Sequence, residues 1–418
     1  MKSNLDKKRR VVVTGRGMIS PLGNNVDDSW KSLLKGDSGI NKIDLFDVTD
    51  FPCEIAAQVK NIDKNDYKNI SRSTLFARRA VEEALTECGI IGNDEMKEKC
   101  SVVFGNSGYR MQMPDFSEAL SEHNDKKHFE VNDINNAEIY YKNRYSAAAE
   151  YLSEYFHLGG ACISLTTACT SGTQSIGLAF RKIKNGEEEM IIAGGSDAMI
   201  TELDLIGFCL LGAVTTNFNN NPKVASRPFN RDRSGFVLGE GGAALVLEDL
   251  EHAKSRNAKI YGEIVGFGNT ISGYSMLDTH PEGEGLSLAM RKALEESGLT
   301  NEEIGYVNAH GTSTRDNDSS ESYAIRDVFP LDTCSTLVSS TKSSTGHMIS
   351  AAGTAELIFT LNAVNYGVLP ATHNLVDIDG KCALNHILEN HNKKIQYGMS
   401  NSLGFGGSNS SIIIKGID

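Results

Sequence analysis

The sequence is short of positive charge. Its 418 residues include 41 lysines and arginines against 54 aspartates and glutamates, which gives a formal net charge of −13. Broad binding to nucleic acid or to an anionic membrane needs a positive field, so this balance argues against both classes. A small basic patch for an acidic partner remains compatible with it. The candidates are Lys7–Arg10, which also fits an ordinary solvated face, and the trio Arg227, Arg231 and Arg233.

Long apolar runs and paired cysteine motifs are also missing. No segment approaches the roughly 20 apolar residues of a membrane helix, and the run Val11–Val13 is far too short for a signal-peptide core. The eight cysteines contain no C-x-x-C pair, and their scatter does not suggest a disulfide framework. These features predict a soluble protein of the reducing cytoplasm, without a membrane or nucleic-acid partner.

Alternating strand and helix patterns organise the chain. Residues 10–14 are typical of a buried strand, and the glycine-containing segment 15–23 predicts a loop. No proline- or serine-rich linker separates the later elements. The alternation predicts an α/β fold with helix-covered sheets, in two comparable halves at 1–250 and 251–418, without a visible residue-level repeat. Helical patterns cover 26–34, 78–88, 137–156, 173–184, 285–297, 318–328 and 352–366.

One cysteine stands out by its context. The segment Ser164–Gly172, SLTTACTSG, places Cys169 between a strand and a helix, with its sulfur near the helix N-terminus. The free N–H groups and the dipole at such an end favour thiolate, which is the nucleophilic form. The backbone N–H of Cys169 is also a candidate donor to a developing oxyanion. A buried structural cysteine is the alternative, and it describes the other seven better.

Two histidines lie in loops of similar character. His310 ends a strand in VNAHGTSTRDNDSSE and is followed by hydroxyl side chains and by Asp318 and Glu321. His347 lies in SSTKSSTGHMISAAGTAE. A structural histidine is the common alternative, but the strand-end position of His310 favours function.

Two charged residues flank His347, and a glycine-rich loop lies further along. Lys342 precedes His347 by five residues and Glu356 follows it by nine, and a lysine beside a carboxylate can be held charged in a pocket. In NSLGFGGSN, glycines flank Phe405, which predicts a flexible loop with an available backbone N–H, although a plain glycine turn is the alternative. One cysteine and two histidines on separate loops fit an acyl-thioester enzyme.

Four motifs together point to a family. The chain is similar to the elongating β-ketoacyl-acyl-carrier-protein synthases of type II in TACTSG, NAHGTST, STKSSTGH and GFGGSN, and also in RVVVTGRGMISPLG, SRPFNRDRSGFVLGEG and KIYGEIVGFG. The resemblance implies the thiolase fold, a duplicated five-layer α-β-α-β-α sandwich. It implies a homodimer, or a heterodimer with a homologous chain-length subunit. It also implies an acyl carrier protein as partner and no redox or metal cofactor.

The resemblance further implies a decarboxylative Claisen condensation in fatty acid or polyketide biosynthesis. Cys169 takes an acyl chain from the carrier protein, and malonyl carrier protein then loses CO₂ and attacks it. His310 and His347 hold the malonyl thioester oxygen, while Lys342, held by Glu356, supports the electrostatics around His347. The resemblance also implies that the N–H groups of Cys169 and Phe405 form an oxyanion hole and that Phe405 gates the entrance. It implies carrier-protein docking by Arg227, with Arg231 as second candidate. The implied substrate contacts are Thr312, Thr314, Tyr109 and Phe208.

Three departures leave the acyl substrate open. Arg315 replaces the proline common after GTST, and TRDND resembles the ketosynthase subunits of aromatic type II polyketide systems. The segment Ser71–Ala80 looks short, without the usual stretch before its helix. Residues 110–160 match poorly, and Tyr109 stands where a smaller aliphatic residue often lines the acyl pocket. These differences favour a specialised pathway.

Four alternatives compete with this interpretation. An acyltransferase or decarboxylase of the same fold needs Cys169 but not both histidines. A non-catalytic chain-length subunit characteristically lacks the cysteine. A dinucleotide-binding dehydrogenase is disfavoured because GRGMIS at 15–20 lacks the last glycine of G-x-G-x-x-G. A zinc enzyme built from Cys169, His310 and His347 lacks local paired-ligand spacing.

Overall fold

The main strands form one continuous mixed sheet. The computed structural model describes residues 8–108 and 144–417. The strands of this sheet are β1 (Val11–Ile19), β4 (Ser101–Asn106), β5 (Cys162–Leu165), β6 (Met190–Asp197), β7 (Gly241–Asp249), β8 (Gly262–Ile271), β9 (Ile304–Asn308), β10 (Leu337–Ser339), β13 (Tyr397–Gly404) and β14 (Ser408–Gly416). Two short pairs lie outside it, β2 (Ile40–Lys42) with β3 (Ile55–Ala57) and β11 (Val368–Leu369) with β12 (His391–Asn392).

The two halves of this sheet have the same topology. Its order is β10-β9-β13-β14-β8-β1-β7-β6-β4-β5. In one half β7 lies antiparallel between β1 and β6, and β6, β4 and β5 run parallel. In the other half β14 lies antiparallel between β8 and β13, and β13, β9 and β10 run parallel. The halves join where Val11–Val13 of β1 pair with Gly262–Ile264 of β8.

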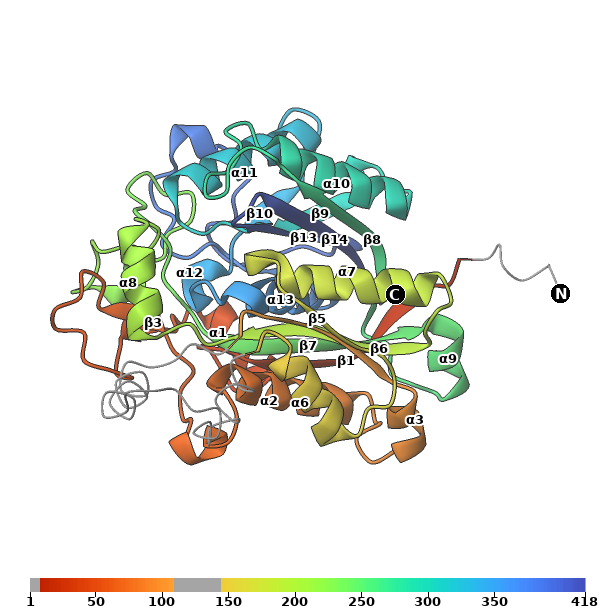
Figure 1. Ribbon diagram of the computed structural model, residues 1–418. Helices are drawn as coiled ribbons and strands as arrows, with labels where there is room; N and C mark the ends of the chain where they lie inside the picture. Colours follow the sequence, from red (N-terminus) through yellow and green to blue (C-terminus); the bar gives the residue numbers. More distant parts are fainter. Residues whose placement is uncertain (1–7, 109–143, 418) are drawn as a thin grey trace, which may run out of the picture.

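Helices cover both halves and fill the space between them. Figure 1 shows the layers in order: α10 and α11, the half with β8 to β14, α7 with α13, the half with β1 to β7, and α2 with α6. The helices are α1 (Val26–Lys35), α2 (Arg72–Glu87), α3 (Asp94–Glu98), α6 (Ala147–Phe156), α7 (Ser171–Lys184), α8 (Glu202–Leu210), α9 (Leu250–Ser255), α10 (Glu284–Ser297), α11 (Arg315–Val328), α12 (Lys342–Thr345) and α13 (Ala352–Tyr366). This is the five-layer α-β-α-β-α arrangement that the sequence resemblance implies.

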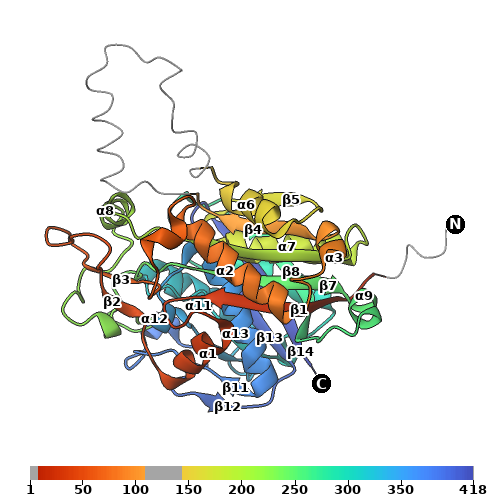
Figure 2. The ribbon, with the colours of Figure 1, turned by 90° about the horizontal axis from the view of Figure 1, so that it is seen from below.

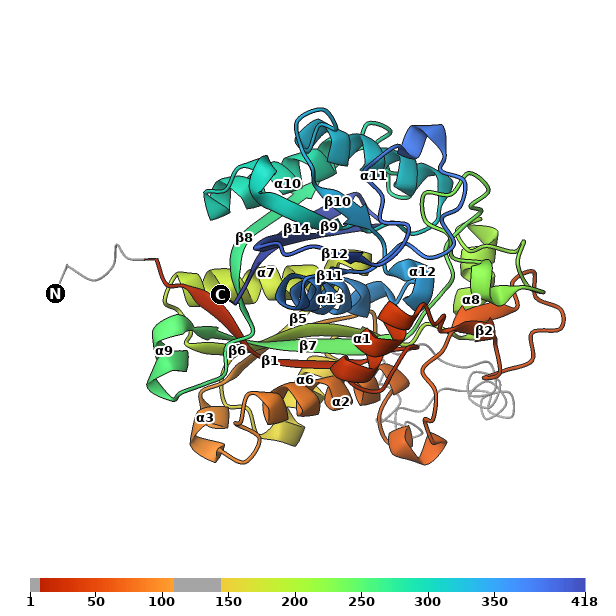
Figure 3. The same ribbon diagram turned by 180° about the vertical axis from the view of Figure 1, so that it is seen from behind.

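The central helix α13 is buried along most of its length. In α13 every residue from Ala352 to Val364 is buried, as expected for a helix that is apolar or small-sided all round. Figure 3 shows α13 between the two halves of the sheet, and Figure 2 shows α2 and α6 on the outer face of one half. Within 8–108 and 144–417, no helix combines the length and the apolar character that a bilayer span requires.

A residue-level similarity between the halves, which is not visible from the sequence alone, accompanies the shared topology. On β1, a Cβ added to Gly17 would lie 1.8 Å from the carbonyl oxygen of Ala80 on α2. On β8, a Cβ added to Gly268 would lie 1.8 Å from the carbonyl oxygen of Ala289 on α10. In each half a glycine therefore lets the helix backbone approach the strand closely. The facing helices read AVEEALTECG at 80–89 and AMRKALEESG at 289–298.

Replacing Gly17 with alanine is expected to lower the free energy of unfolding by about 2 kcal/mol or more, because strand and helix must separate to admit the methyl group. The measurement is urea unfolding followed by circular dichroism. Gly92→Ala is the matched control, since Gly92 is exposed and a Cβ there meets no atom within 4 Å. Equal stability of the two variants would contradict the close-packing argument.

Three element boundaries differ from the sequence predictions. β1 continues through Ile19, where the sequence predicts a loop from residue 15, and a register shift between Val13 and Gly15 accommodates the glycines. α2 begins at Arg72 rather than 78, because the Ser71 side chain accepts a hydrogen bond from the Thr74 N–H and caps the helix. α11 begins at Arg315 rather than 318. The helix predicted over 137–156 lies partly outside the described residues, and within them α6 forms its helical part.

Candidate active site

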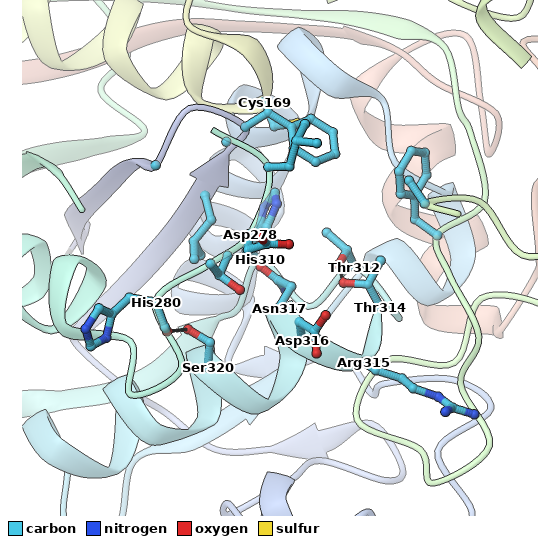
Figure 4. A pocket seen from close by; sticks show the side chains of 18 of the residues that line it. Cys169, Asp278, His280, His310, Thr312, Thr314, Arg315, Asp316, Asn317 and Ser320 are labelled. Carbon is cyan, nitrogen blue, oxygen red and sulfur yellow. Dashed lines mark hydrogen bonds between the residues drawn. The ribbon is translucent and has the colours of Figure 1, made fainter. Parts of the chain in front are cut away.

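A pocket of about 470 Å³ gathers the candidate residues from loops of both halves. Cys169 follows β5 and precedes α7, whereas His347 follows β10 and α12 and precedes α13. Because β5 and β10 end the sheet at equivalent places, the loops that carry Cys169 and His347 correspond to each other in the two halves. His310 follows β9 and Phe405 lies in the turn between β13 and β14. Figure 4 shows Cys169 and His310 within this pocket, and the carboxyl ends of parallel strands are where such sites are expected.

Cys169 lies in the predicted turn between strand and helix. Ala168 before it has a φ of 51°, a left-handed conformation that is strained for a residue with a side chain, and α7 begins two residues later at Ser171. The thiol is buried, and the backbone N–H groups of Cys169 itself and of Phe405 favour negative charge on its sulfur. Gly404 lies against this turn, since a Cβ there would lie 3.1 Å from the Thr167 carbonyl oxygen. A strained turn thus presents the sulfur to two backbone donors.

The protonation state of Cys169 differs from the expectation. Burial raises the pKa of its thiol to about 12, and Lys342 and the two backbone N–H groups oppose this rise. The sequence argument that the helix end favours thiolate therefore does not decide the protonation state here, because loss of hydration is the larger effect. A nucleophilic attack by this sulfur needs a proton acceptor or a leaving group that takes the proton.

The two histidines present the same tautomer. Lys342 Nζ lies 3.1 Å from Nδ1 of His310, and because an ammonium only donates, that nitrogen accepts and the ring proton resides on Nε2. Nδ1 of His347 accepts from the Ile349 N–H at 3.3 Å, which also leaves the proton on Nε2. That Nε2 is buried and has no hydrogen-bond partner among the described residues. The ring centroids are 5.2 Å apart in an edge-to-face arrangement.

Both imidazoles are neutral. Burial lowers the pKa of His310 well below its usual value of 6.5, and the charge of Lys342 and the neighbouring His347 lower it further. Burial also lowers the pKa of His347, and Lys342 adds to this effect. At neutral pH the pocket therefore contains two uncharged rings that can each donate one Nε2–H to an oxygen.

Lys342 and Glu356 form a buried ion pair, as the sequence predicts. Their side chains are 1% and 2% exposed, and Lys342 Nζ donates to Glu356 Oε1. The same ammonium donates to the backbone carbonyl of His310 at 2.7 Å and to Nδ1 of the His310 ring. Together with the bond to Glu356, these contacts use all three hydrogens of the ammonium. The predicted electrostatic effect of Lys342 on His347 is present, because its charge lowers the pKa of that ring, while its hydrogen bonds go to His310.

Two carboxylates fix the loop that carries His310. Glu321 accepts from the backbone N–H groups of His310 at 2.8 Å and Gly311 at 2.7 Å. Asp318 accepts from the Ser313 N–H at 3.2 Å, and Ser313 itself has a φ of 71°. Burial raises the pKa of Glu321 to about 7, although these backbone donors oppose the rise. The acidic residues noted after His310 in the sequence thus act on backbone amides.

The remaining predicted residues separate into those at the pocket and those beyond it. Thr312 and Thr314 line the pocket, with their hydroxyl oxygens 2.9 Å apart. The Phe405 side chain lines both this pocket and a shallower groove beside it, and it is 38% exposed. Phe208 packs on Phe236 instead of lining the pocket, with ring centroids 5.3 Å apart. Tyr109 lies outside the described residues.

The candidate docking arginines are neutralised by neighbours. The Arg227 side chain is 12% exposed and pairs with Asp232 at 2.5 Å. Arg231 pairs with Asp377 at 3.0 Å, and Arg233 is buried. The trio is therefore not a patch of unpaired charge, and docking through Arg227 stays a prediction.

Two parts of the pocket are not identified by the sequence analysis. Phe236 lines it and contacts the His347 ring edge-to-face at 5.4 Å, and its place in SGFVLGEG was the available signal. A loop from Ser272 to Gly283 forms part of the wall without any motif to mark it. This loop is tied to the Phe405 turn, since the Ser272 N–H donates to the Gly407 carbonyl and the Gly406 N–H to the Met276 carbonyl, each at 2.8 Å.

Comparison with known protein families agrees with this geometry. Residues 8–253 match the model of the beta-ketoacyl synthase N-terminal domain, and residues 261–376 match that of the C-terminal domain. The chain belongs to the β-ketoacyl synthase family. It is an acyl-transferring condensing enzyme with the thiolase fold, so the family resemblance of the four motifs is confirmed.

Particular relatives cover the whole length of the chain. The 3-oxoacyl-[acyl-carrier-protein] synthase 2 of Vibrio cholerae is 40% identical over 422 residues, 98% of this chain and 99% of that protein. A β-ketoacyl synthase from Burkholderia phymatum superposes with a TM-score of 0.88 at 31% identity, over 98% and 100% of the two chains. Another solved structure is a complex of a type II polyketide synthase acyl-carrier protein with its ketosynthase. One chain of that complex superposes with a TM-score of 0.87 at 27% identity, over 98% of this chain and 100% of that chain.

Proposed function

We propose that this chain joins an acyl group on Cys169 to a malonyl unit by decarboxylative Claisen condensation, with both substrates delivered by an acyl carrier protein. The observation that carries the proposal is the pairing of a buried cysteine, faced by two backbone N–H groups, with two neutral imidazoles that offer Nε2–H donors. The backbone N–H groups suit the carbonyl of the acyl-cysteine, and the imidazole N–H groups suit the carbonyl of the malonyl thioester.

The first half-reaction is acyl transfer. The Cys169 sulfur attacks the carbonyl carbon of the acyl thioester, and the N–H groups of Cys169 and Phe405 stabilise the oxyanion. The carrier thiol then leaves and takes the proton that the cysteine loses. Because one thioester replaces another, the bonds formed and broken are alike, and a thiol with a raised pKa can serve.

The second half-reaction makes the carbon–carbon bond. The Nε2–H groups of His310 and His347 donate to the malonyl thioester oxygen, which gains negative charge as CO₂ departs and an enolate forms. The enolate carbon attacks the acyl-cysteine carbonyl, and the Cys169 sulfur leaves and regains a proton. Neutral donors suit this step, because they stabilise the enolate without protonating its carbon.

No step changes the oxidation state of the enzyme, so the proposal includes no cofactor of the enzyme's own. The carrier protein is supported by the complex of a similar ketosynthase with its acyl carrier protein. A second chain, either a copy or a homologous chain-length subunit, is supported by β5, a partly exposed strand at the sheet edge. A cytoplasmic site of action is supported by eight free cysteines.

The test supplies the wild-type enzyme with an acyl-loaded and a malonyl-loaded carrier protein, and follows both enzyme and products by mass spectrometry. We expect an acyl adduct on Cys169 that disappears as CO₂ and a β-ketoacyl carrier protein form. A Cys209→Ser variant is the matched control, since Cys209 is a partly exposed free cysteine that does not line the pocket. Release of CO₂ without chain extension would favour a non-condensing decarboxylase, and an adduct on another cysteine would refute the assignment of Cys169.

A further inference from the structure

Arg315, where the chain departs from the family pattern, lies at the rim of the catalytic pocket. It is the first residue of α11, and its side chain is exposed while it lines the pocket with Thr312 and Thr314. Among the described residues lining this pocket it is the only lysine or arginine. The hydrogen bond from its Nε to the Arg233 carbonyl is long at 3.5 Å, and Arg315 forms no ion pair with the described part of the chain.

The backbone beneath this side chain is held rigidly. The buried guanidinium of Arg233 donates to the backbone carbonyl of Thr314 at 3.1 Å and to that of Arg315 at 2.8 Å. Arg233 is anchored in turn by Asp379 at 2.7 Å. The Cα of Arg315 is therefore fixed relative to Thr312 and Thr314, while its guanidinium extends to solvent as an unneutralised charge.

The residues from sulfur to rim follow the order of groups in a phosphopantetheine arm. Figure 4 shows Cys169 in the interior, Thr312 and Thr314 further along, and Arg315 at the outer end. The arm carries its thiol at one end, two amides in the middle and a phosphate at the other end. Hydroxyl groups suit the amides, and a guanidinium suits the phosphate, which it can bind through two parallel hydrogen bonds.

We propose that Arg315 binds the phosphate of the phosphopantetheine arm while the acyl thioester lies at Cys169. This inference rests on the proposed function, because it assumes a carrier-bound thioester. Asp278 and Asp316 also line the pocket, and their carboxylates repel an approaching phosphate. Arg315 offsets that repulsion at the point where the arm enters, a task that Arg227 cannot perform while it pairs with Asp232.

The experiment compares three acyl donors that differ in the proposed contact. These are an acyl-pantetheine without phosphate, the same acyl-phosphopantetheine, and the acyl carrier protein. The measured quantity is kcat/KM for acylation of Cys169, read by intact-protein mass. We expect Arg315→Ala to lower kcat/KM about tenfold for both phosphate-containing donors and to leave acyl-pantetheine unchanged. Arg315→Lys should retain part of the effect, because an ammonium keeps the charge without the forked geometry.

Arg231→Ala is the matched control, because Arg231 is exposed but pairs with Asp377 and does not line the pocket. It should leave kcat/KM unchanged for acyl-pantetheine and acyl-phosphopantetheine. An equal loss for all three donors in Arg315→Ala would overturn the inference in favour of a structural effect, and a loss with the carrier protein alone would assign the contact to protein side chains. No loss at all would also overturn it. Failure of the wild-type enzyme to acylate Cys169 would instead refute the proposed function.

Discussion

Replacing His347 with alanine is expected to lower the rate of condensation by about 10³-fold, while the variant still takes an acyl group onto Cys169. The reason is that Nε2 of His347 is a buried donor without a partner among the described residues, so its hydrogen is available for the oxygen that becomes charged in decarboxylation. Acyl transfer instead uses the N–H groups of Cys169 and Phe405. The measurement is a single-turnover assay that records the acyl adduct and the extended product separately.

Two further variants make this result interpretable. Cys169→Ala should lose both acylation and condensation, since the acyl acceptor is gone. His373→Ala is the matched histidine control, because burial likewise lowers the pKa of His373 while its Nε2 contacts the Leu33 carbonyl at 3.3 Å, away from the catalytic pocket. If His347→Ala condensed at the wild-type rate, or lost acylation as fully as Cys169→Ala, the division of labour between the two donor sets would be wrong.

The catalytic loops could be predicted from the sequence because each one combines a reactive side chain with the end of a predicted strand. A strand pattern that ends in small residues and one reactive side chain predicts a strand-end loop, and parallel strands bring such loops to one edge of a sheet. Cys169 and His310 were found by this signal, which needs only local spacing. The structure adds that the loops of Cys169 and His347 occupy equivalent places in the two halves, a relation that depends on strand order and is not visible along the chain.

Other features could not be predicted because they depend on which elements pack together. Gly17 in GRG looks like a turn residue, yet it lies within β1, where the Ala80 carbonyl of α2 leaves no room for a side chain. Lys342 is close to His347 in sequence, but the folded loops direct its hydrogen bonds to His310. The state of the Cys169 thiol was predicted from the helix end, whereas its burial depends on the whole surrounding pocket.

Replacing Lys342 with methionine is expected to lower the free energy of unfolding by about 3–5 kcal/mol at neutral pH, because it leaves Glu356 buried without a partner. Burial raises the pKa of Glu356 to about 7 even with Lys342 beside it, and loss of the lysine raises that pKa further. The folded variant then keeps a proton that the unfolded carboxyl loses, so its stability should fall as pH rises from 5 to 8. Urea unfolding across that range measures both effects.

Lys42→Met is the matched control for this pair. Lys42 pairs with Glu54 at 2.8 Å, but its side chain is 59% exposed, so its loss should cost less than about 1 kcal/mol. A similar cost for the two variants would mean that Lys342 and Glu356 are not coupled as a buried pair.

The double variant Lys342→Met/Glu356→Leu separates stability from catalysis. Removing both charges leaves no buried ion, so we expect stability near that of the wild type and a flat pH dependence. Condensation should nevertheless stay low, because His310 loses the ammonium that donates to its Nδ1 and fixes its proton on Nε2. Acylation of Cys169 should persist. Recovery of condensation along with stability would show that the ion pair serves only the fold, whereas recovery of stability alone makes Lys342 a positioning residue for His310.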